Sequence, residues 1–336
     1  MSKAVIEKGL NKIWYGQRPV PAVLRWFSGL YRWAMRHRSA KSKGSAPIPV
    51  VVIGNVVVGG GGKTPVVRAI AQALKSAGHR VVVVARGYGA ARSRKTPCWV
   101  DQHSDPSTLG DEPCALARYA GLEVVVCADR ARAVRAAVAA GADMVVSDDG
   151  LQNPHLPHSY TVCVVDGLRG FGNGQLLPAG PLREPIERLS DFDRVWVKGG
   201  NFEPNGPFER FHLKPEQLRK LSDGSVEQMR HWQGRSVLAV CGIANPEGFR
   251  VTLEALGMVV TLVALPDHHR FAASDLSALS TRLPIVVTEK DAVKLEALQL
   301  PQALGDRIYV LSVEASIEPS VVRAVVEDIE RIKCDE

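Results

Sequence analysis

The pattern of apolar and polar positions predicts alternating strands and helices. Short runs of Val, Ile and Ala, too short for helices and bounded by turn formers, indicate buried strands. They occur at residues 49–53, 81–85, 124–127, 144–147, 162–166 and 195–198. Helical spacing follows the glycine-rich segment as far as Ala77 and covers residues 130–140. This alternation predicts an α/β fold with a parallel, doubly wound sheet.

A second alternation begins after a polar, proline-containing stretch at residues 199–232, which we interpret as a boundary. Its strands are predicted at residues 237–241, 259–265, 285–288 and 308–311, and a helix closes the chain near residues 319–332. We therefore expect one domain over residues 46–200 and a second, smaller α/β domain over residues 201–336 that closes over a cleft. No internal repeat is visible.

The first 45 residues form a different kind of segment. After Pro21, apolar residues recur at helical spacing on one face, and arginines follow at intervals of seven and four on another. Such an amphipathic helix, with tryptophans on one side and arginines on the other, is typical of the lipid–water boundary. The alternative is a helix packed on its own protein with solvated charges. The apolar positions are Val23, Trp26, Phe27, Leu30, Trp33 and Ala34.

Charge is concentrated in that arm. Of the formal net charge of +7, residues 1–45 contribute ten Lys or Arg against the single acid Glu7, so the remainder of the chain is slightly negative. A nucleic-acid-binding fold more often spreads basic residues over its main surface. No apolar stretch is long enough for a transmembrane helix. The six cysteines include no C-x-x-C pair, which argues against a zinc ribbon.

A glycine-rich turn joins the first strand to the first helix and predicts a phosphate-binding loop. Its glycines let backbone N–H groups approach a phosphate, and the helix N-terminus favours negative charge. Lys63 is expected to reach the β- and γ-phosphates, and Thr64 to hold Mg²⁺. The strict P-loop pattern is missed because Val57 replaces its first glycine. A membrane-recruited switch ATPase is an alternative, but that variant loop has a lysine where this chain has Val58. The glycines are Gly59, Gly60, Gly61 and Gly62.

Candidate functional carboxylates and a histidine stand at the ends of predicted strands or at the starts of predicted helices. Asp148 and Asp149 come at the end of a buried strand, where a carboxylate that organises Mg²⁺ belongs. Asp111 and Glu112 precede a helical segment, as helix caps or as a catalytic base. His268 follows another strand and is a candidate acid–base or orienting group. In a turn-rich loop, Arg183 could neutralise phosphate and Glu184 could reach the metal.

These motifs together resemble the tetraacyldisaccharide 4'-kinase family of Gram-negative bacteria over nearly the whole chain. Several ordered motifs at matching spacing are more specific than any one of them. They are residues 54–55 with 59–65, 86–89, 110–113, 148–152, 177–184, 267–268 and 288–292.

The resemblance implies a P-loop kinase that transfers the γ-phosphate of ATP, with Mg²⁺, to the 4'-hydroxyl of a tetraacylated glucosamine disaccharide 1-phosphate in lipid A biosynthesis. It implies a peripheral enzyme on the cytoplasmic face of the inner membrane, held there through residues 1–45. No nucleic acid and no obligate protein partner is expected.

Carried onto this sequence, the family pattern assigns roles to the same residues. Asp111 looks like the base that accepts the sugar hydroxyl's proton, and His268 like its orienting partner. Lys63 and Thr64 serve the phosphates and Mg²⁺, with further metal-site residues after the buried strand and in the turn-rich loop. The metal-site residues are Asp148, Asp149 and Glu184. A less specific assignment places five further residues along the phosphate and substrate region: Arg86, Tyr88, Glu112, Arg130 and Arg183.

The sequence departs from the family pattern at three places. Asn153 stands where His is usual, His158-Ser159 replaces an Arg-Asp pair, and Gly61 replaces a Thr or Ser. Contacts to the lipid headgroup near residues 153–159 are therefore open. Residues 288–294 belong to the resemblance without an explained role; they could hold the second domain's sheet or line the cleft. We expect hinge closure between the domains to bring His268 to Asp111.

Overall fold

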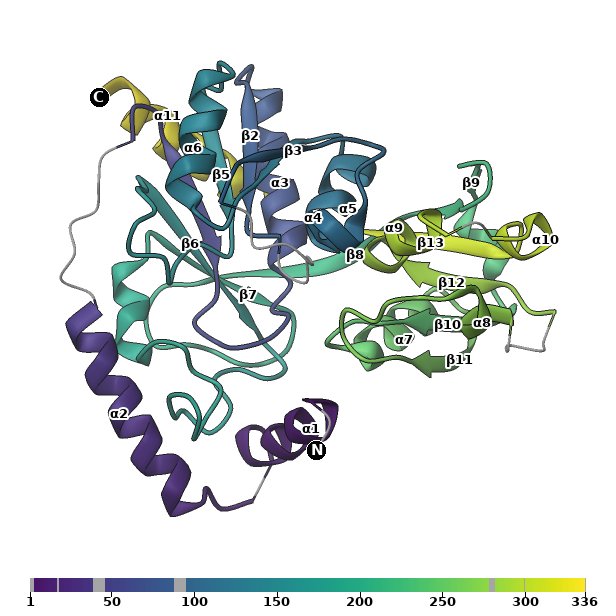
Figure 1. Ribbon diagram of the computed structural model, residues 1–336, viewed down its shortest axis with the longest axis horizontal. Helices are drawn as coiled ribbons and strands as arrows, with labels where there is room; N and C mark the ends of the chain where they lie inside the picture. Colours follow the sequence, from purple (N-terminus) through teal and green to yellow (C-terminus); the bar gives the residue numbers. More distant parts are fainter. Residues whose placement is uncertain are drawn as a thin grey trace. The chain divides into compact units, whose positions relative to one another are not determined.

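The computed structural model describes residues 3–16, 18–38, 46–87, 95–277, 282–298 and 300–335 (Figure 1). The chain divides into two compact units, each built from separate stretches of sequence. Unit 1 contains residues 1–85, 129–212 and 315–336, and unit 2 contains residues 86–128 and 213–314.

Unit 1 is organised around a parallel sheet in the order β7-β6-β1-β5-β2. The central strand β1 pairs with β5 on one side and β6 on the other, with Val52 opposite both Ser147 and Thr161. The apolar runs predicted as strands are buried because helices and loops cover the sheet. The strands are β1 (Val50–Gly54), β2 (Val81–Ala85), β5 (Met144–Asp148), β6 (Tyr160–Asp166) and β7 (Arg194–Lys198).

Helices α3, α6 and α11 pack on the sheet of unit 1 or on one another. Helix α3 (Lys63–Ser76) leaves the glycine-rich loop and covers β1, β2 and β5. Helix α6 (Arg130–Ala139) packs on β2, and the Asp129 side chain caps its first turn by accepting from the backbone N–H of Arg132. The C-terminal helix α11 (Pro319–Asp335) packs along α3. A short 3₁₀ helix spans Ile186–Asp191.

The described part of the N-terminal arm includes the helices α1 (Lys3–Trp14) and α2 (Ala22–Arg38), and both contact the rest of unit 1. The indole N–H of Trp14 donates to the carbonyl of Pro178 at 3.1 Å. From α2, the Ser28 hydroxyl donates to the carbonyl of Leu176 at 2.9 Å, and the Tyr31 hydroxyl donates to the carbonyl of Arg183 at 3.0 Å. One side of α2 therefore belongs to the fold of its own unit.

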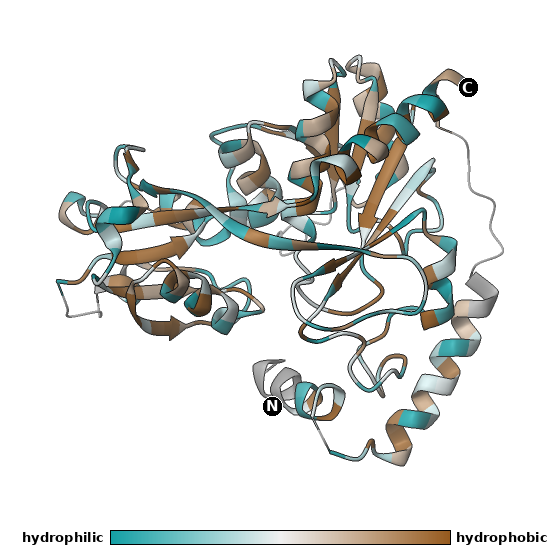
Figure 2. Ribbon diagram, turned by 180° about the vertical axis from the view of Figure 1, so that it is seen from behind, coloured by the Kyte–Doolittle hydropathy of each residue, from teal (hydrophilic) through white to brown (hydrophobic). Residues whose placement is uncertain are grey.

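A second side of α2 carries exposed apolar residues. The alternation of brown and teal along this helix is visible in Figure 2. Trp26 is 66% exposed and Trp33 is 59% exposed. Tryptophan side chains in folded proteins are on average largely buried, so this exposure is unusual. The helix predicted after Pro21 is thus present, and it both packs on its own unit and leaves an apolar stripe uncovered. The other members of the stripe are Val23, Phe27 and Leu30.

Unit 2 contains a second parallel sheet, in the order β11-β10-β12-β13. Its strands are β10 (Ser236–Cys241), β11 (Val259–Ala264), β12 (Ile285–Thr288) and β13 (Ile308–Ser316), the last of which runs into unit 1 at its end. The connecting helices are α7 (Pro246–Ala255), α8 (Ala273–Ser277), α9 (Glu289–Glu296) and α10 (Gln302–Gly305).

Residues 86–128 add a small subdomain to unit 2. It contains the antiparallel pair β3 (Cys98–Val100) and β4 (Glu123–Val126), the short helix α4 (Pro106–Leu109) and helix α5 (Asp111–Ala120). Helix α5 packs on α9. An ion pair of 2.7 Å between Arg118 on α5 and Glu296 on α9 ties the two helices together.

The two units correct the expected domain bounds. Residues 86–128 belong with the second alternation because α5 packs on α9, and the closing helix belongs with the first because α11 packs on α3. The boundary predicted within residues 199–232 agrees with the passage of the chain between the units, but this stretch has regular structure. It contains the long strand β8 (Glu209–Lys220), whose pair with β9 (Val226–Glu227) is antiparallel, and a 3₁₀ helix over Met229–Trp232. The chain passes between units inside β8, after His212.

Candidate active site

The glycine-rich loop lies at the carboxyl end of β1 and opens α3, as predicted. Gly59 and Gly62 have φ values of 110° and 82°, a region that favours glycine. A Cβ on Gly62 would also lie 2.7 Å from the side chain of Lys198. The Asn55 side chain accepts from the backbone N–H of Val57 at 2.8 Å and so fixes the start of the loop. Backbone N–H groups at a helix N-terminus form a ready anion site.

A charged network surrounds this loop within unit 1. Lys63 lies 3.4 Å from Asp149, and Arg183 donates to both oxygens of the same carboxylate at 3.1 and 3.0 Å. Burial works to raise the pKa of Asp149, but these two cations hold it below its usual value. Asp149 has a φ of 53°, which turns its side chain out of the strand that ends at Asp148.

The loop that contains Arg183 and Glu184 is hydrogen-bonded to the start of the glycine-rich loop. Backbone hydrogen bonds join Arg183 N–H to the carbonyl of Val56 at 2.7 Å and Val58 N–H to the carbonyl of Pro181 at 2.9 Å. Gln152 links the same parts: its amide donates to the carboxylate of Glu184 and accepts from Arg183, each at 3.0 Å.

Arg130, one of the less specifically assigned residues, is buried in unit 1. Its guanidinium donates to the carbonyl of Asp148 at 3.1 Å and lies 3.4 Å from that of Asp149. The structure thus gives Arg130 contacts to the backbone that carries both aspartates.

The residues proposed for Mg²⁺ offer oxygen donors of the kind that this ion prefers. Thr64 provides a hydroxyl at the start of α3, and carboxylates are provided by Asp148, the last residue of β5, and by Asp149 directly after it. Glu184 is buried and paired with Arg188 at 3.2 Å. Among the residues that the structure describes, no group of three His, Cys, Asp or Glu side chains could hold a metal ion by itself. The hydroxyl and carboxylate oxygens present are of the type that fits a hard cation.

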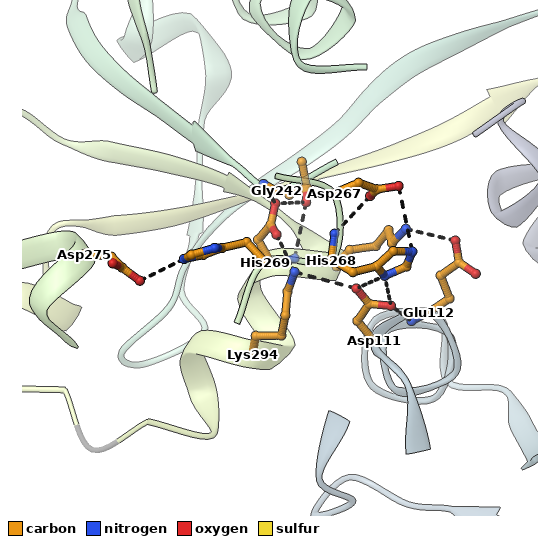
Figure 3. Close-up of polar contacts among 11 residues, drawn as sticks. Asp111, Glu112, Gly242, Asp267, His268, His269, Asp275 and Lys294 are labelled. Atoms are coloured by element: carbon orange, nitrogen blue, oxygen red, sulfur yellow. Dashed lines mark hydrogen bonds and ion pairs between the residues drawn. The ribbon is translucent and has the colours of Figure 1, made fainter. Parts of the chain in front are cut away.

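Unit 2 contains a carboxylate–imidazole pair (Figure 3). Asp111 is the first residue of α5, and His268 lies in the turn after β11 with a φ of 57°. The Nδ1 atom of His268 lies 2.9 Å from Oδ2 of Asp111 and 3.2 Å from Oδ1. The Asp111 carboxylate also accepts from the backbone N–H of Glu112 at 2.9 Å. On the other side of the imidazole, Asp267 lies 3.9 Å from Nε2.

The surroundings of this pair favour its charged form. Asp111 is only 5% exposed, and burial alone would raise its pKa. The hydrogen bond from His268 and the nearby Lys290, His268 and Lys294 charges outweigh burial and lower the pKa of Asp111 to about 2. The hydrogen bond to Asp111 in turn raises the pKa of His268 against the opposing effect of burial.

Two lysines from α9 complete the surroundings. Lys290 forms an ion pair of 2.9 Å with Glu112, and the ammonium of Lys294 lies 3.6 Å from Oδ2 of Asp111. The sequence indicated the segment that contains them, but not these contacts. The signal that could have found them is the spacing of four, which places both lysines on one face of a helix.

Comparisons with known proteins identify the family. A family model described as tetraacyldisaccharide-1-P 4'-kinase matches residues 20–330. The chain belongs to this kinase family.

Several tetraacyldisaccharide 4'-kinases match this chain over most of their own length. The tetraacyldisaccharide 4'-kinase of Halorhodospira halophila is 46% identical over 87% of this chain and 84% of its own. That of Alkalilimnicola ehrlichii is 44% identical over 90% and 88%, and that of Pseudomonas aeruginosa 40% over 92% and 93%. The solved structure of LpxK from Aquifex aeolicus, an "apo" form in complex with ATP, superposes with a TM-score of 0.74 at 25% identity, covering 91% of this chain and 97% of that one.

Membership of the tetraacyldisaccharide 4'-kinase family confirms the predicted resemblance, the α/β fold and the class of enzyme, an ATP-dependent kinase of lipid A biosynthesis. The roles of individual residues stay predictions. The structure gathers Lys63, Asp149 and Arg183 beside the glycine-rich loop of unit 1.

Unit 2 holds the predicted proton-transfer residues of this kinase. Asp111 and His268 meet there, and Glu112 is ion-paired beside them. Arg86 is exposed at the end of β2, and Tyr88 lies outside the described residues.

The expected role of hinge closure is also wrong. Closure between two domains is not needed to bring His268 to Asp111, because both residues belong to unit 2 and are already in contact. The error follows from the domain bounds, since the sequence assigned the Asp111 helix to the first domain.

Proposed function

We propose that this kinase transfers the γ-phosphate of ATP to the 4'-hydroxyl of a tetraacylated glucosamine disaccharide 1-phosphate. The observation that carries the proposal is the buried Asp111–His268 pair, with its 2.9 Å contact, in a chain that also has a phosphate loop. A hydroxyl acceptor needs a group that takes its proton, and this pair supplies one.

The phosphate loop provides positioning and positive charge for transfer. Lys63 at the start of α3 would contact the β- and γ-phosphates, and Arg183 would neutralise the charge that spreads over the transferred group. In the structure both cations are held at Asp149. We infer that phosphate binding draws Lys63 and Arg183 from the Asp149 carboxylate, which is then available to a metal ion.

Asp111 is the proposed proton acceptor. As the hydroxyl oxygen bonds to the γ-phosphorus, its proton passes to a carboxylate oxygen of Asp111 and the bond to the β-phosphate oxygen breaks, so that ADP leaves with the electron pair. His268 fixes the orientation of the carboxylate through its Nδ1 contact. The low pKa of Asp111 keeps the acceptor ionised at physiological pH.

We assign the Mg²⁺ site to Thr64, Asp148 and Asp149, and we assign a supporting role to Glu184. Their oxygen donors suit a hard cation that keeps nucleotide and water ligands. The ion would neutralise charge on the phosphates. Gln152 and Arg188 fix Glu184, so this carboxylate is better placed to support the loop than to move toward a metal.

We propose that α2 holds the kinase at the cytoplasmic face of the inner membrane, in which its acylated substrate would reside. No helix among the described residues has the length and apolar character to cross a membrane. The exposed stripe of α2 would enter the upper acyl region, and the exposed Arg25 and Arg32 would face anionic headgroups.

The function is tested with γ-labelled ATP, Mg²⁺ and the detergent-dispersed disaccharide lipid. We expect label on the lipid with the wild-type kinase, and none with Lys63→Met. The matched control is Lys75→Met, which removes an exposed lysine from the last turn of the same helix and should leave transfer unchanged. Label found only in inorganic phosphate would favour the switch ATPase instead.

A further inference from the structure

Helix α9 begins with an anchor that is fully buried. Asp291 has no exposed surface, and its carboxylate accepts from the hydroxyl of Thr288, the N-cap residue, at 2.8 Å. The same carboxylate accepts from the backbone N–H of Gly242 at 3.1 Å. The carbonyl of Gly242 in turn accepts from the backbone N–H of His268, also at 3.1 Å. Asp291 therefore fixes the backbone on which His268 is held.

One turn further along α9, Lys294 connects this anchor to the proposed base. Its ammonium lies 2.8 Å from Oδ1 of Asp291 and 3.6 Å from Oδ2 of Asp111. It also lies over the ring of Phe271, 5.3 Å from the centroid, which restricts it from a third side. Figure 3 shows Lys294 pointing toward Asp111 and the residues around Gly242.

The charges explain why a cation is needed at this point. Asp111 and Asp291 are both buried carboxylates, and two anions in a dry environment repel each other and favour protonation. A lysine between them removes that cost and gives each carboxylate a fixed partner. Removing one member of such a group leaves an uncompensated buried charge.

We propose that Lys294 is a positioning residue for phosphoryl transfer: it ties the carboxylate of Asp111 to the Asp291 anchor, so that the base and the backbone of His268 keep one geometry. In this assignment Lys294 contacts neither the nucleotide nor the sugar hydroxyl, and it acts through Asp111. The inference rests on the proposed function, and it gives residues 288–294 the role that the sequence left unexplained.

The test compares Lys294→Met with Lys294→Arg in the full-length kinase, using the labelled-lipid assay with ATP and lipid varied. Lys294→Met keeps the length of the side chain and removes its charge. We expect kcat to fall roughly 10- to 100-fold, the cost of a slightly displaced base, while the KM for ATP stays within about twofold. Lys294→Arg should recover most of kcat. The control is Lys220→Met, which breaks a 2.9 Å ion pair with Asp306 elsewhere in unit 2 and should have no effect on kcat.

A double-mutant cycle shows whether Lys294 acts through the base. If it does, Lys294→Met should cause no further loss of the residual kcat in an Asp111→Asn background. An equal additional loss there would mean a general structural effect and would overturn the proposal, as would wild-type kcat in Lys294→Met. Should Lys294→Met not fold, Lys294→Gln carries the comparison, and equal kcat for the Gln, Arg and wild-type proteins would overturn it.

The same assay separates failure of the inference from failure of the proposed function. If Asp111→Asn abolishes labelling of the lipid and Lys294→Met does not reduce it, only the positioning role is lost. If Asp111→Asn retains full activity, the assignment of the base is wrong.

Discussion

The apolar stripe of α2 gives a quantitative test of membrane binding. Trp26 and Trp33 are 66% and 59% exposed, so roughly 150 Å² of each ring system is open to water. At about 25 cal/mol per Å², complete transfer of that surface to hydrocarbon would contribute about 4 kcal/mol. An interfacial helix buries only part of its apolar side. We therefore expect about 2 kcal/mol from each tryptophan, or roughly 30-fold in the partition coefficient.

The assay is sedimentation of the kinase with sucrose-loaded vesicles that contain anionic lipid. Trp33→Ala should reduce the partition coefficient at least about tenfold, and Trp26→Ala should do the same. The control is Trp99→Ala, which removes a tryptophan that is 42% exposed on β3 of unit 2 and should leave binding unchanged. Salt should weaken binding further through the exposed Arg25 and Arg32.

Two results would refute this reasoning. Equal binding of Trp33→Ala and wild type would mean that the stripe does not enter the bilayer, and equal loss in Trp99→Ala would mean that any exposed tryptophan suffices. Point substitutions are preferable to removal of residues 1–36, because Trp14 and Tyr31 hydrogen-bond to the rest of unit 1. A truncated protein would lose those contacts together with the stripe.

Three substitutions test other parts of the structure. Gly62→Ala should lower the free energy of unfolding by about 1–2 kcal/mol in urea denaturation, because alanine is strained at a φ of 82° and its Cβ meets Lys198; unchanged stability would contradict the loop conformation. Trp14→Phe should cost about 1 kcal/mol in the same assay, because the carbonyl of Pro178 loses its donor. Asp111, with its pKa lowered from 3.8 to about 2, should contribute about 2 kcal/mol above pH 4 that is lost as the pH falls toward 2. The stability gap between wild type and Asp111→Asn should accordingly narrow by about 1 kcal/mol between pH 7 and pH 3, and a constant gap would contradict the shift.

The strands of both sheets could be predicted because their sequences leave little choice. Residues 50–53 and 81–84 are uninterrupted β-branched runs, and such runs are typical of strands covered on both faces. The glycine-rich turn that joins β1 to α3 could be predicted for a similar reason, since four glycines between a strand and a helix are a local signal. Both predictions depend only on neighbours in the sequence.

The composition of the two units could not be predicted in this way. Nothing in the sequence of α5 indicates that its partner is α9, some 170 residues later, because each helix simply presents an apolar side. The long strand β8 was missed because its sequence includes Pro215 and several charged residues. Its side chains alternate between more and less buried positions, and such a sequence is easily interpreted as a loop. The composition of the two units therefore depends on packing between elements that are distant in the sequence, which local patterns do not indicate.

The proposed base illustrates how a local signal and long-range packing combine. Thr288 and Asp291 have the spacing of a helix N-cap and its third residue, and Asp291 and Lys294 have the spacing of a helical ion pair. Both contacts exist in the structure, so half of the arrangement follows from local rules. The other half needs Gly242 and Asp111, which reach Asp291 and Lys294 only through the fold of unit 2. Because every partner of the Asp111 carboxylate described above belongs to that unit, its orientation is set by the folding of unit 2, and the energy of substrate binding need not be spent on assembling the base.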